Sequence, residues 1–173
     1  MPQATPSGTV FDGYRPGALA AVLEMYVDYY SRHWCFGQAF ETKLAAERAE
    51  FLCRADPERD LFLTAWRGDR LAGTITVDVS AGGPEGAHLR WFIVADGARG
   101  NGLGTMLIGR ALVHCARVGT DSVWLTTFAG LEAARRLFER HGFKLESESA
   151  ADQWSGSVRE QKFVRCEKGR VQG

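Results

Sequence analysis

The chain has few of the residues that mark zinc proteins, secreted proteins or membrane proteins. It contains only four cysteines and four histidines in 173 residues. The cysteines form no C-x-x-C pair and the histidines no H-E-x-x-H motif, so neither a disulfide framework nor a metal site is expected. No run reaches the roughly 18 apolar residues of a membrane helix, and residues 1–14 lack the basic and apolar regions of a signal peptide. We therefore expect a cytoplasmic protein that does not bind membranes.

Neither sign of charge is in excess. Lysine and arginine total 21, aspartate and glutamate total 21, and the formal net charge is zero. Without a basic surplus, nucleic acid is not an expected partner. The length fits one domain with a full-sized core. We expect that domain at residues 9–166, between a flexible N-terminus at 1–8 and a C-terminal tail at 167–173.

Two common nucleotide-binding motifs are also missing, although a glycine-rich turn is present at residues 99–104. Its alternating glycines separate a strand-like run at 88–94 from a helical run at 105–118. Such a turn exposes the unpaired N–H groups of the helix start to a phosphate, and the helix dipole adds positive charge. The spacing does not fit G-x-G-x-x-G, and the chain contains no Gly-Lys-Ser/Thr. The turn therefore predicts another phosphate-bearing cofactor, with an ordinary helix start as the alternative.

Hydrophobic periodicity predicts the remaining elements. Apolar residues alternate in segments expected to be strands and recur at helical spacing in segments expected to be helices. The strands are expected at 9–14, 61–66, 71–79, 88–94, 123–127, 143–147 and 157–165, and the helices at 16–30, 39–54, 105–118 and 130–141. The predicted order is β-α-α-β-β-β-α-β-α-β-β, without internal repeats.

The glycine-rich turn resembles the acetyl-coenzyme A signature of the GCN5-related N-acetyltransferases, the GNAT family. That signature is Gln/Arg-x-x-Gly-x-Gly/Ala, which Arg99, Gly102 and Gly104 match. Residues 92–94 precede it as the family's cofactor strand does, and residues 133–143, a predicted helix ending in Gly-Phe, look like the second signature. The resemblance implies an α/β (α+β) GNAT fold, with a twisted, mixed and mostly antiparallel sheet of about seven strands flanked by about four helices.

The resemblance also implies the cofactor and the residues that hold it. The cofactor is expected to be acetyl-CoA, with its pyrophosphate on the glycine-rich turn. Its thioester carbonyl is expected against backbone N–H groups at the end of the cofactor strand, where fixed dipoles stabilise developing negative charge. The implied cofactor-binding residues are Phe92, Ile93, Val94, Arg99, Gly100, Asn101, Gly102, Leu103, Gly104, Thr105 and Phe138.

Several shorter phrases narrow the resemblance. Residues 36–41, 90–94, 124–128 and 160–163 resemble the acetyltransferase half of proteins that fuse a MarR-type winged-helix repressor to a GNAT domain. The repressor half does not occur in this sequence, so DNA binding is not carried over. The narrower resemblance implies a small amine or an amino acid as the acceptor, rather than a histone tail.

Two positions depart from the family's pattern. Phe138 stands where the family usually has a tyrosine as general acid, and Leu131 stands where it has a cofactor-contacting asparagine. Three alternatives remain open. The thiolate leaves without a proton donor, since a thiol pKa of about 8.5 makes it a tolerable leaving group. In the second alternative, a hydroxyl of Thr127, Tyr29 or Tyr30 donates the proton in place of the missing tyrosine. Otherwise the chain binds acetyl-CoA without turnover.

The acceptor site is predicted around the cofactor strand. His88, whose type titrates near neutral pH, and Glu41, which borders the acceptor cleft in this fold, are the candidate catalytic bases. Arg90 shares a strand face with His88 and Phe92 by two-residue alternation, and its guanidinium suits a substrate carboxylate. A solvated histidine, a surface carboxylate and a structural salt bridge are the alternatives. The predicted substrate-binding residues are Trp34, Phe36, Arg90, Thr127 and Trp154.

These residues predict an acetyl-CoA-dependent N-acetyltransferase that acts on a small-molecule primary amine. A carboxylate at Glu41 and a guanidinium at Arg90 would suit a zwitterion, so an amino acid or a related amine is the expected acceptor. One alternative is a non-catalytic module that binds or senses acyl-CoA. Another is a protein N-acetyltransferase, which the lack of an acidic cluster does not favour. A homodimer is compatible with the sequence.

Overall fold

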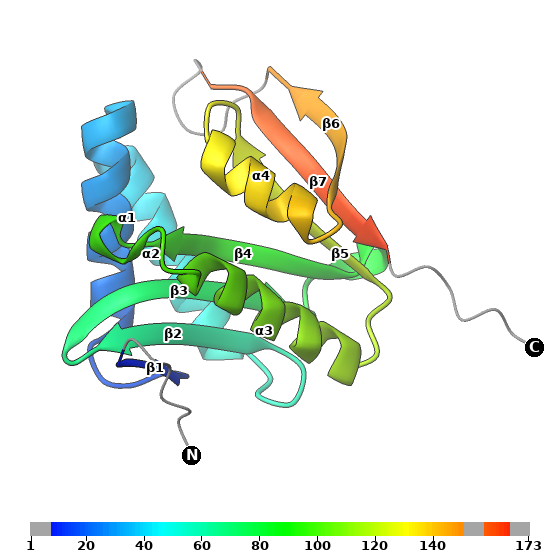
Figure 1. Cartoon of the computed structure of the whole chain (residues 1–173), viewed down its shortest axis with the longest axis horizontal. Coiled ribbons are helices and arrows are strands. Elements are labelled where there is room, and N and C mark those ends of the chain that lie inside the picture. The colour runs from blue at the N-terminus through cyan, green and yellow to red at the C-terminus, as the bar shows by residue number, and fades with distance from the viewer. Residues whose placement is uncertain (1–7, 151–157, 167–173) are drawn as a thin grey trace, which may run out of the picture.

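A mixed seven-stranded sheet forms the centre of the molecule (Figure 1). The computed structural model describes residues 8–150 and 158–166, so the predicted flexible ends lie almost entirely outside the described residues. The elements in chain order are β1 (Thr9–Asp12), α1 (Ala18–Trp34), α2 (Gln38–Arg54), β2 (Leu61–Arg67), β3 (Arg70–Asp78), β4 (Ala87–Val94), α3 (Leu103–Arg117), β5 (Ser122–Phe128), α4 (Glu132–Arg140), β6 (Lys144–Ser149) and β7 (Glu160–Cys166).

The strands pair in the order β1-β2-β3-β4-β5-β7-β6. Among the described strands, the β4–β5 pair is parallel and the other pairs are antiparallel. The predicted order of elements and the predicted fold class are confirmed, and each helix and strand begins within a few residues of its expected start.

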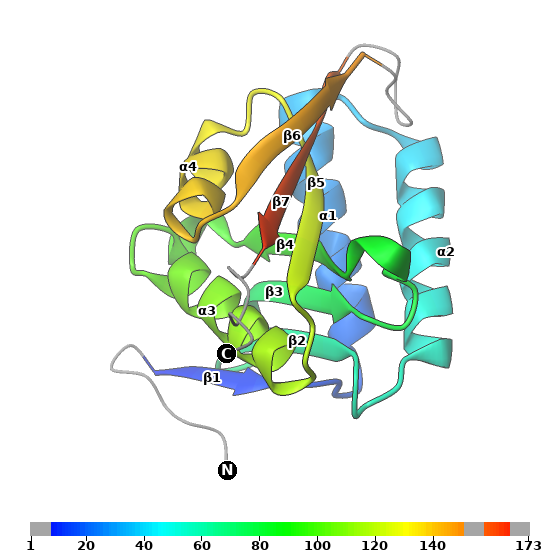
Figure 2. The same ribbon diagram turned by 90° about the vertical axis from the view of Figure 1, so that its right-hand side faces the viewer.

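The helices cover both faces of the sheet, with α1 and α2 on one face and α3 and α4 on the other (Figures 1 and 2). Each face therefore has its own apolar core. Val22, Phe40 and Ile93 belong to the core under α1 and α2, whereas Leu107 and Leu137 belong to the core under α3 and α4. Burial on both faces explains why β3 is buried at nearly every position.

A bulge in β4 changes which side chains share a face. The β3–β4 register moves from Thr76–Arg90 to Thr74–Ile93, so two residues of β4, Trp91 and Phe92, oppose one residue of β3. Trp91 has a positive φ of 52° at this point. The prediction that Phe92 shares a face with Arg90 is therefore wrong, because the extra residue turns Phe92 toward α4.

The parallel pair β4–β5 is short, and this opens the sheet. The two strands pair only at Ala87–Val123 and His88–Trp124. Beyond His88, no described strand pairs with the edge of β4 that faces β5, so its backbone groups are open to a ligand. The opening lies next to the start of α3, which brings the predicted cofactor turn and the predicted acceptor residues to one side of the molecule (Figure 1).

Candidate functional site

A cavity of about 670 Å³ lies where α3 begins, against the end of β4 and the start of α4. It contains nine of the eleven predicted cofactor-binding residues along its wall: Phe92, Ile93, Val94, Arg99, Gly100, Gly102, Leu103, Gly104 and Thr105. Asn101 is exposed and outside this wall. Phe138 is a buried core residue that lines the neighbouring cavity instead.

Glycines make the start of α3 accessible. Gly102 caps the helix in a left-handed conformation, with φ of 76°, and no acidic side chain occupies the first turn. Met106 N–H donates the first intrahelical hydrogen bond, to Gly102 O at 3.0 Å. The N–H groups of residues 103–105 consequently have no acceptor within the helix. They supply the unpaired donors and the partial positive charge that an anionic group requires.

Gly104 has a different role from Gly102. A Cβ added at Gly104 would lie 2.9 Å from Leu137 Cδ2 and 3.2 Å from Phe92 Cζ, whereas one added at Gly102 would meet no atom within 4 Å. Gly104 therefore lets α3 approach α4 and β4 closely. Gly102 keeps the space in front of the helix start open.

Two guanidinium groups add positive charge to this cavity. Arg99 is about half exposed, donates from Nε to Val94 O at 3.2 Å and pairs with Asp96 at 3.2 Å. Arg140 lines the cavity from α4. Arg140 is not among the predicted residues, because a basic side chain in the last helical turn also suits an ordinary helix end. The unpaired N–H groups and the two cations fit the phosphates of acetyl-CoA.

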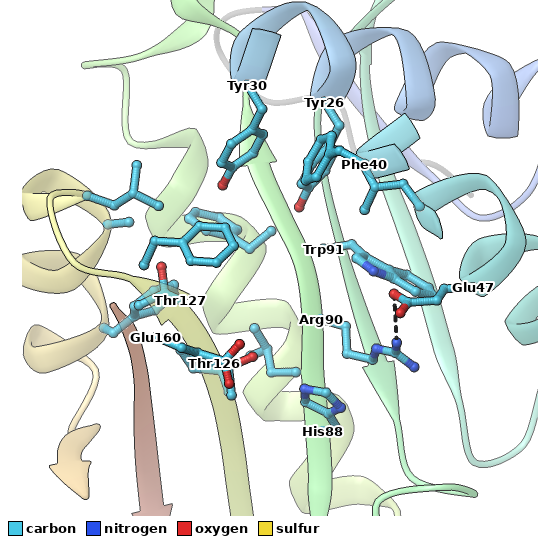
Figure 3. Close-up of a pocket in the computed structure, with 18 residues that line it drawn as sticks. Tyr26, Tyr30, Phe40, Glu47, His88, Arg90, Trp91, Thr126, Thr127 and Glu160 are labelled. Atoms are coloured by element: carbon cyan, nitrogen blue, oxygen red, sulfur yellow. Dashed lines mark hydrogen bonds and ion pairs between the residues drawn. The ribbon is translucent and has the colours of Figure 1, made fainter. Parts of the chain in front are cut away.

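A second, smaller cavity of about 240 Å³ lies in the opening between β4 and β5 (Figure 3). We call it the acceptor pocket. Tyr26 and Tyr30 line it from α1, Glu47 from α2, and Glu160 from the start of β7. Of the predicted site residues, His88, Arg90, Phe92, Thr127 and Phe138 line it as well.

Tyr30 lies on the walls of both cavities. Thr127 lines only the acceptor pocket, and Tyr29 lines the cofactor cavity but not the acceptor pocket. Burial raises the pKa of Tyr30 above its ordinary value, so its hydroxyl is protonated at neutral pH. Among the hydroxyls considered as replacements for the missing tyrosine, Tyr30 is the one that borders both cavities.

His88 is a weaker base than its residue type suggests. Its ring stacks on the ring of Trp124, with the centroids 3.6 Å apart and the planes 9° apart. Burial, with a smaller contribution from the nearby Arg90 charge, lowers the pKa of His88 to about 3. The side chain is therefore neutral between pH 5 and pH 8, and the neutral-range titration expected for it does not fit this environment.

The carboxylate that meets Arg90 is Glu47, not Glu41. Arg90 Nη2 lies 3.5 Å from Glu47 Oε2, and Arg90 Nη1 lies 3.3 Å from Asp78 Oδ2. Glu41 is exposed and lines a groove between α1 and the ends of β3 and β4. Helical spacing explains why Glu47 rather than Glu41 faces Arg90: the inward face of α2 carries Phe40, Leu44 and Glu47, at i, i+4 and i+7. The predicted pairing of Glu41 with Arg90 around one acceptor is therefore not formed.

Arg90 belongs to an ion-pair network below the pocket. Asp78 accepts hydrogen bonds from Arg54 at 3.1 and 2.5 Å and from Ala81 N–H at 3.0 Å. Burial alone would raise the pKa of Asp78, but these hydrogen bonds and the Arg54 and Arg90 charges outweigh it and hold the pKa below its ordinary value. The structural salt bridge considered for Arg90 is thus present, although the same side chain also lines the pocket.

The remaining predicted residues support the pocket from behind or lie outside the described part of the chain. Phe36 is buried and packs on Tyr30 and Phe40, with ring centroids 5.9 and 4.8 Å apart. Trp34 packs against Phe128, with centroids 6.2 Å apart. Trp154 lies outside the described residues. Phe138 packs edge to face on Phe92, with centroids 5.7 Å apart.

Neither a metal site nor a membrane-spanning helix is found among the described residues. Within residues 8–150 and 158–166, no group of three His, Cys, Asp or Glu side chains is arranged to hold a metal ion. In the same part of the chain, no helix is both long enough and apolar enough to span a membrane.

Comparisons with known proteins found a matching family and a relative of known activity. Residues 19–143 match the family described as the acetyltransferase (GNAT) family. Mycothiol acetyltransferase of Geodermatophilus obscurus is 37% identical over 86 residues, which are 47% of this chain but only 28% of that protein. The chain thus matches less than a third of this relative's length.

Solved structures share the fold. A GCN5-related N-acetyltransferase from Kribbella flavida superposes with a TM-score of 0.74 at 18% identity, covering 94% of this chain and 100% of that one. The yncA protein of Salmonella typhimurium, solved with its cofactor acetyl-CoA, gives a TM-score of 0.70 at 15% identity, covering 95% and 97%. At these identities the likeness shows the fold.

Proposed function

Because the chain belongs to the acetyltransferase (GNAT) family, whose acyl donor is acetyl-CoA, we propose that it transfers the acetyl group to the primary amine of a small molecule. The observation that carries this proposal is the junction of two cavities at Tyr30. One cavity suits phosphates, and the other is small and lies beside the unpaired edge of β4. Acetyl-CoA, when bound, supplies an acyl group activated as a thioester.

Different groups of this chain bind the phosphates and polarise the carbonyl of the thioester. The N–H groups at the start of α3, with Arg99 and Arg140, hold the phosphates by charge and hydrogen bonding. The unpaired edge of β4 beyond His88 presents backbone N–H groups to the opening between the strands. Donors fixed in this way stabilise negative charge on a carbonyl oxygen at little reorganisation cost.

Proton transfer requires one group to donate and another to accept. We assign the donor role to Tyr30, because it is the tyrosine that borders both cavities. The carboxylates of Glu47 and Glu160 line the acceptor pocket and are the groups that we propose to receive the proton of the amine. His88 is assigned no role as a base, since its pKa is lowered to about 3.

The size of the acceptor pocket supports a small acceptor. A volume of about 240 Å³ suits a compact molecule rather than a folded polypeptide segment. The narrower resemblance to the acetyltransferase half of MarR-type fusion proteins points the same way. We propose that the reaction takes place in the cytoplasm.

Thiol release from acetyl-CoA with a panel of amines tests the proposal. We expect release that depends on the amine in the wild-type protein and is lost in Gly102→Asp, which places a carboxylate at the start of α3. A panel in which acetyl-CoA binds but no amine accelerates thiol release would instead favour the acyl-CoA-sensing alternative.

A further inference from the structure

Arg48 is a cation buried in the apolar core beneath α1 and α2. It is 1% exposed, and its guanidinium carbon lies 4.2 Å from the ring centroid of Tyr26 and 4.8 Å from that of Trp91. Nη1 donates to Leu44 O at 3.4 Å, but Nε and Nη2 find no hydrogen-bond partner among the described residues. Buried polar groups are normally hydrogen-bonded, so these two donors need an explanation.

The residues around Arg48 form one wall of the acceptor pocket. Tyr26, Leu44 and Trp91 all line the pocket, which places Arg48 directly behind that wall. The hydroxyl of Tyr26 points into the pocket (Figure 3). Burial lowers the pKa of Arg48 only to about 10, so the guanidinium is charged at neutral pH. Burial raises the pKa of Tyr26, so its hydroxyl is protonated and can donate.

Arg48 forms no salt bridge among the described residues, although the Glu47 charge lies near it. Glu47 faces Arg90 at 3.5 Å, and Arg90 is also held by a second carboxylate. His88 is neutral at physiological pH because its pKa is lowered. Glu160 lies on the opposite wall of the pocket from Trp91 (Figure 3). On the side of α1 and α2, Glu47 and Asp78 are thus both paired with Arg90, whereas the wall at β7 carries the carboxylate of Glu160.

We propose that the acceptor amine also carries a carboxylate, which binds at the Tyr26 and Arg48 wall, so that the acceptor is an amino acid or a similar zwitterion. This inference rests on the proposed acetyl transfer. Tyr26 donates the hydrogen bond, and Arg48 supplies the charge from behind it. The amine then lies on the side of Glu160 and Thr127, which selects Glu160 from the two carboxylates proposed to receive its proton. Arg48 acts as a specificity-determining residue, in place of the carboxylate-binding role predicted for Arg90.

The test compares free α-amino acids with the matching amino-acid amides, which lack only the carboxylate. We expect Arg48→Met, which keeps a long apolar side chain, to lower the acid-to-amide ratio of kcat/KM by about tenfold or more, because the guanidinium charge that attracts the carboxylate is removed. The loss should appear in KM. Arg48→Lys should retain part of the preference. Arg32→Met removes the same charge from the exposed side of α1, where the side chain is 56% exposed, and should leave the ratio unchanged.

Thermal unfolding separates recognition from structural support. Removing a buried cation with unpaired donors should leave the melting temperature of Arg48→Met equal to or above that of wild type. A lower melting temperature with an unchanged acid-to-amide ratio would show that Arg48 is only a structural clamp between α1 and β4, and would overturn the inference.

Binding without turnover distinguishes this inference from the proposed function. With CoA present, amino acids should stabilise the wild-type protein more than their amides do, and Arg48→Met should lose this difference. If this holds but neither series is acetylated, the proposed function fails and the carboxylate site stands. If both series are acetylated equally well by the wild-type protein, the carboxylate site fails and the proposed function stands.

Discussion

Substituting Gly102 by aspartate tests the phosphate site at the start of α3. The backbone there has φ of 76°, and an added Cβ would meet no atom within 4 Å, so the side chain would occupy the space in front of the helix. Two unit charges about 5 Å apart repel by about 3 kcal/mol at an effective dielectric constant of about 20. We therefore expect the Kd for acetyl-CoA to rise by about a hundredfold or more.

Gly119 offers a matched control at the other end of α3. It also has φ of 76° with no atom within 4 Å of an added Cβ. A non-glycine residue in this conformation costs roughly 1–2 kcal/mol at either site. An aspartate near the helix C-terminus also opposes the helix dipole, whereas one at the N-terminus is favoured by it, each by about 0.3–1 kcal/mol. Gly119→Asp should thus lose more stability than Gly102→Asp, yet keep its affinity for acetyl-CoA.

Calorimetric titration with acetyl-CoA and chemical denaturation of both variants measure the two effects. The expected order of affinity is opposite to the expected order of stability, so general unfolding cannot mimic the result. Equal affinity of Gly102→Asp and the wild-type protein would refute the assignment of the phosphates to this turn.

Four further predictions follow from the two cavities and the core. Tyr30→Phe should lower kcat by about a hundredfold with acetyl-CoA affinity nearly unchanged, whereas Thr127→Val should have little effect, as steady-state kinetics will show. Phe138→Tyr should not accelerate turnover and should lower the unfolding free energy by about 1–3 kcal/mol, because its hydroxyl enters an aromatic core. His88→Gln should leave the shape of the pH–rate profile between pH 6 and pH 8 unchanged, since His88 is neutral throughout that range. The pKa of Asp78 is lower in the folded protein than the unfolded value of about 3.9, so Asp78 stabilises the fold fully above that value, and the stabilisation is lost as the pH falls through the folded pKa. Asp78→Asn should therefore reduce the dependence of the unfolding free energy on pH in this acidic range, as chemical denaturation at several pH values will show.

The elements could be predicted from the sequence because each has a clear local signal. Apolar periodicity located the strands and helices, and the glycines at 100, 102 and 104 marked the start of α3. Gly100 and Gly102 have positive φ, and Gly104 lets α3 approach its neighbours closely. Glycine meets both backbone requirements easily, which explains why the glycine pattern predicted the turn.

The acceptor side was harder to predict because it depends on details of register. The bulge at Trp91 inserts one residue into β4, and two-residue alternation cannot reveal such an insertion. Choosing Glu41 rather than Glu47 required knowing which face of α2 is buried. Arg48 did carry a signal, since it occupies the apolar stripe of α2 formed by Phe40, Leu44 and Phe51. A charged residue within an apolar stripe is the observation that would have found it.

Acetyl transfer to a small amine consumes one thioester for each amide bond formed, so measuring both products shows whether this chain catalyses it. The protein is incubated with acetyl-CoA and the mixed amine panel, and free thiol and N-acetylated products are quantified together by mass spectrometry. We expect one acetylated amine for each thiol released, with the yields of both products falling together in Gly102→Asp. Thiol release without any acetylated amine, or binding of acetyl-CoA with neither product, would contradict it.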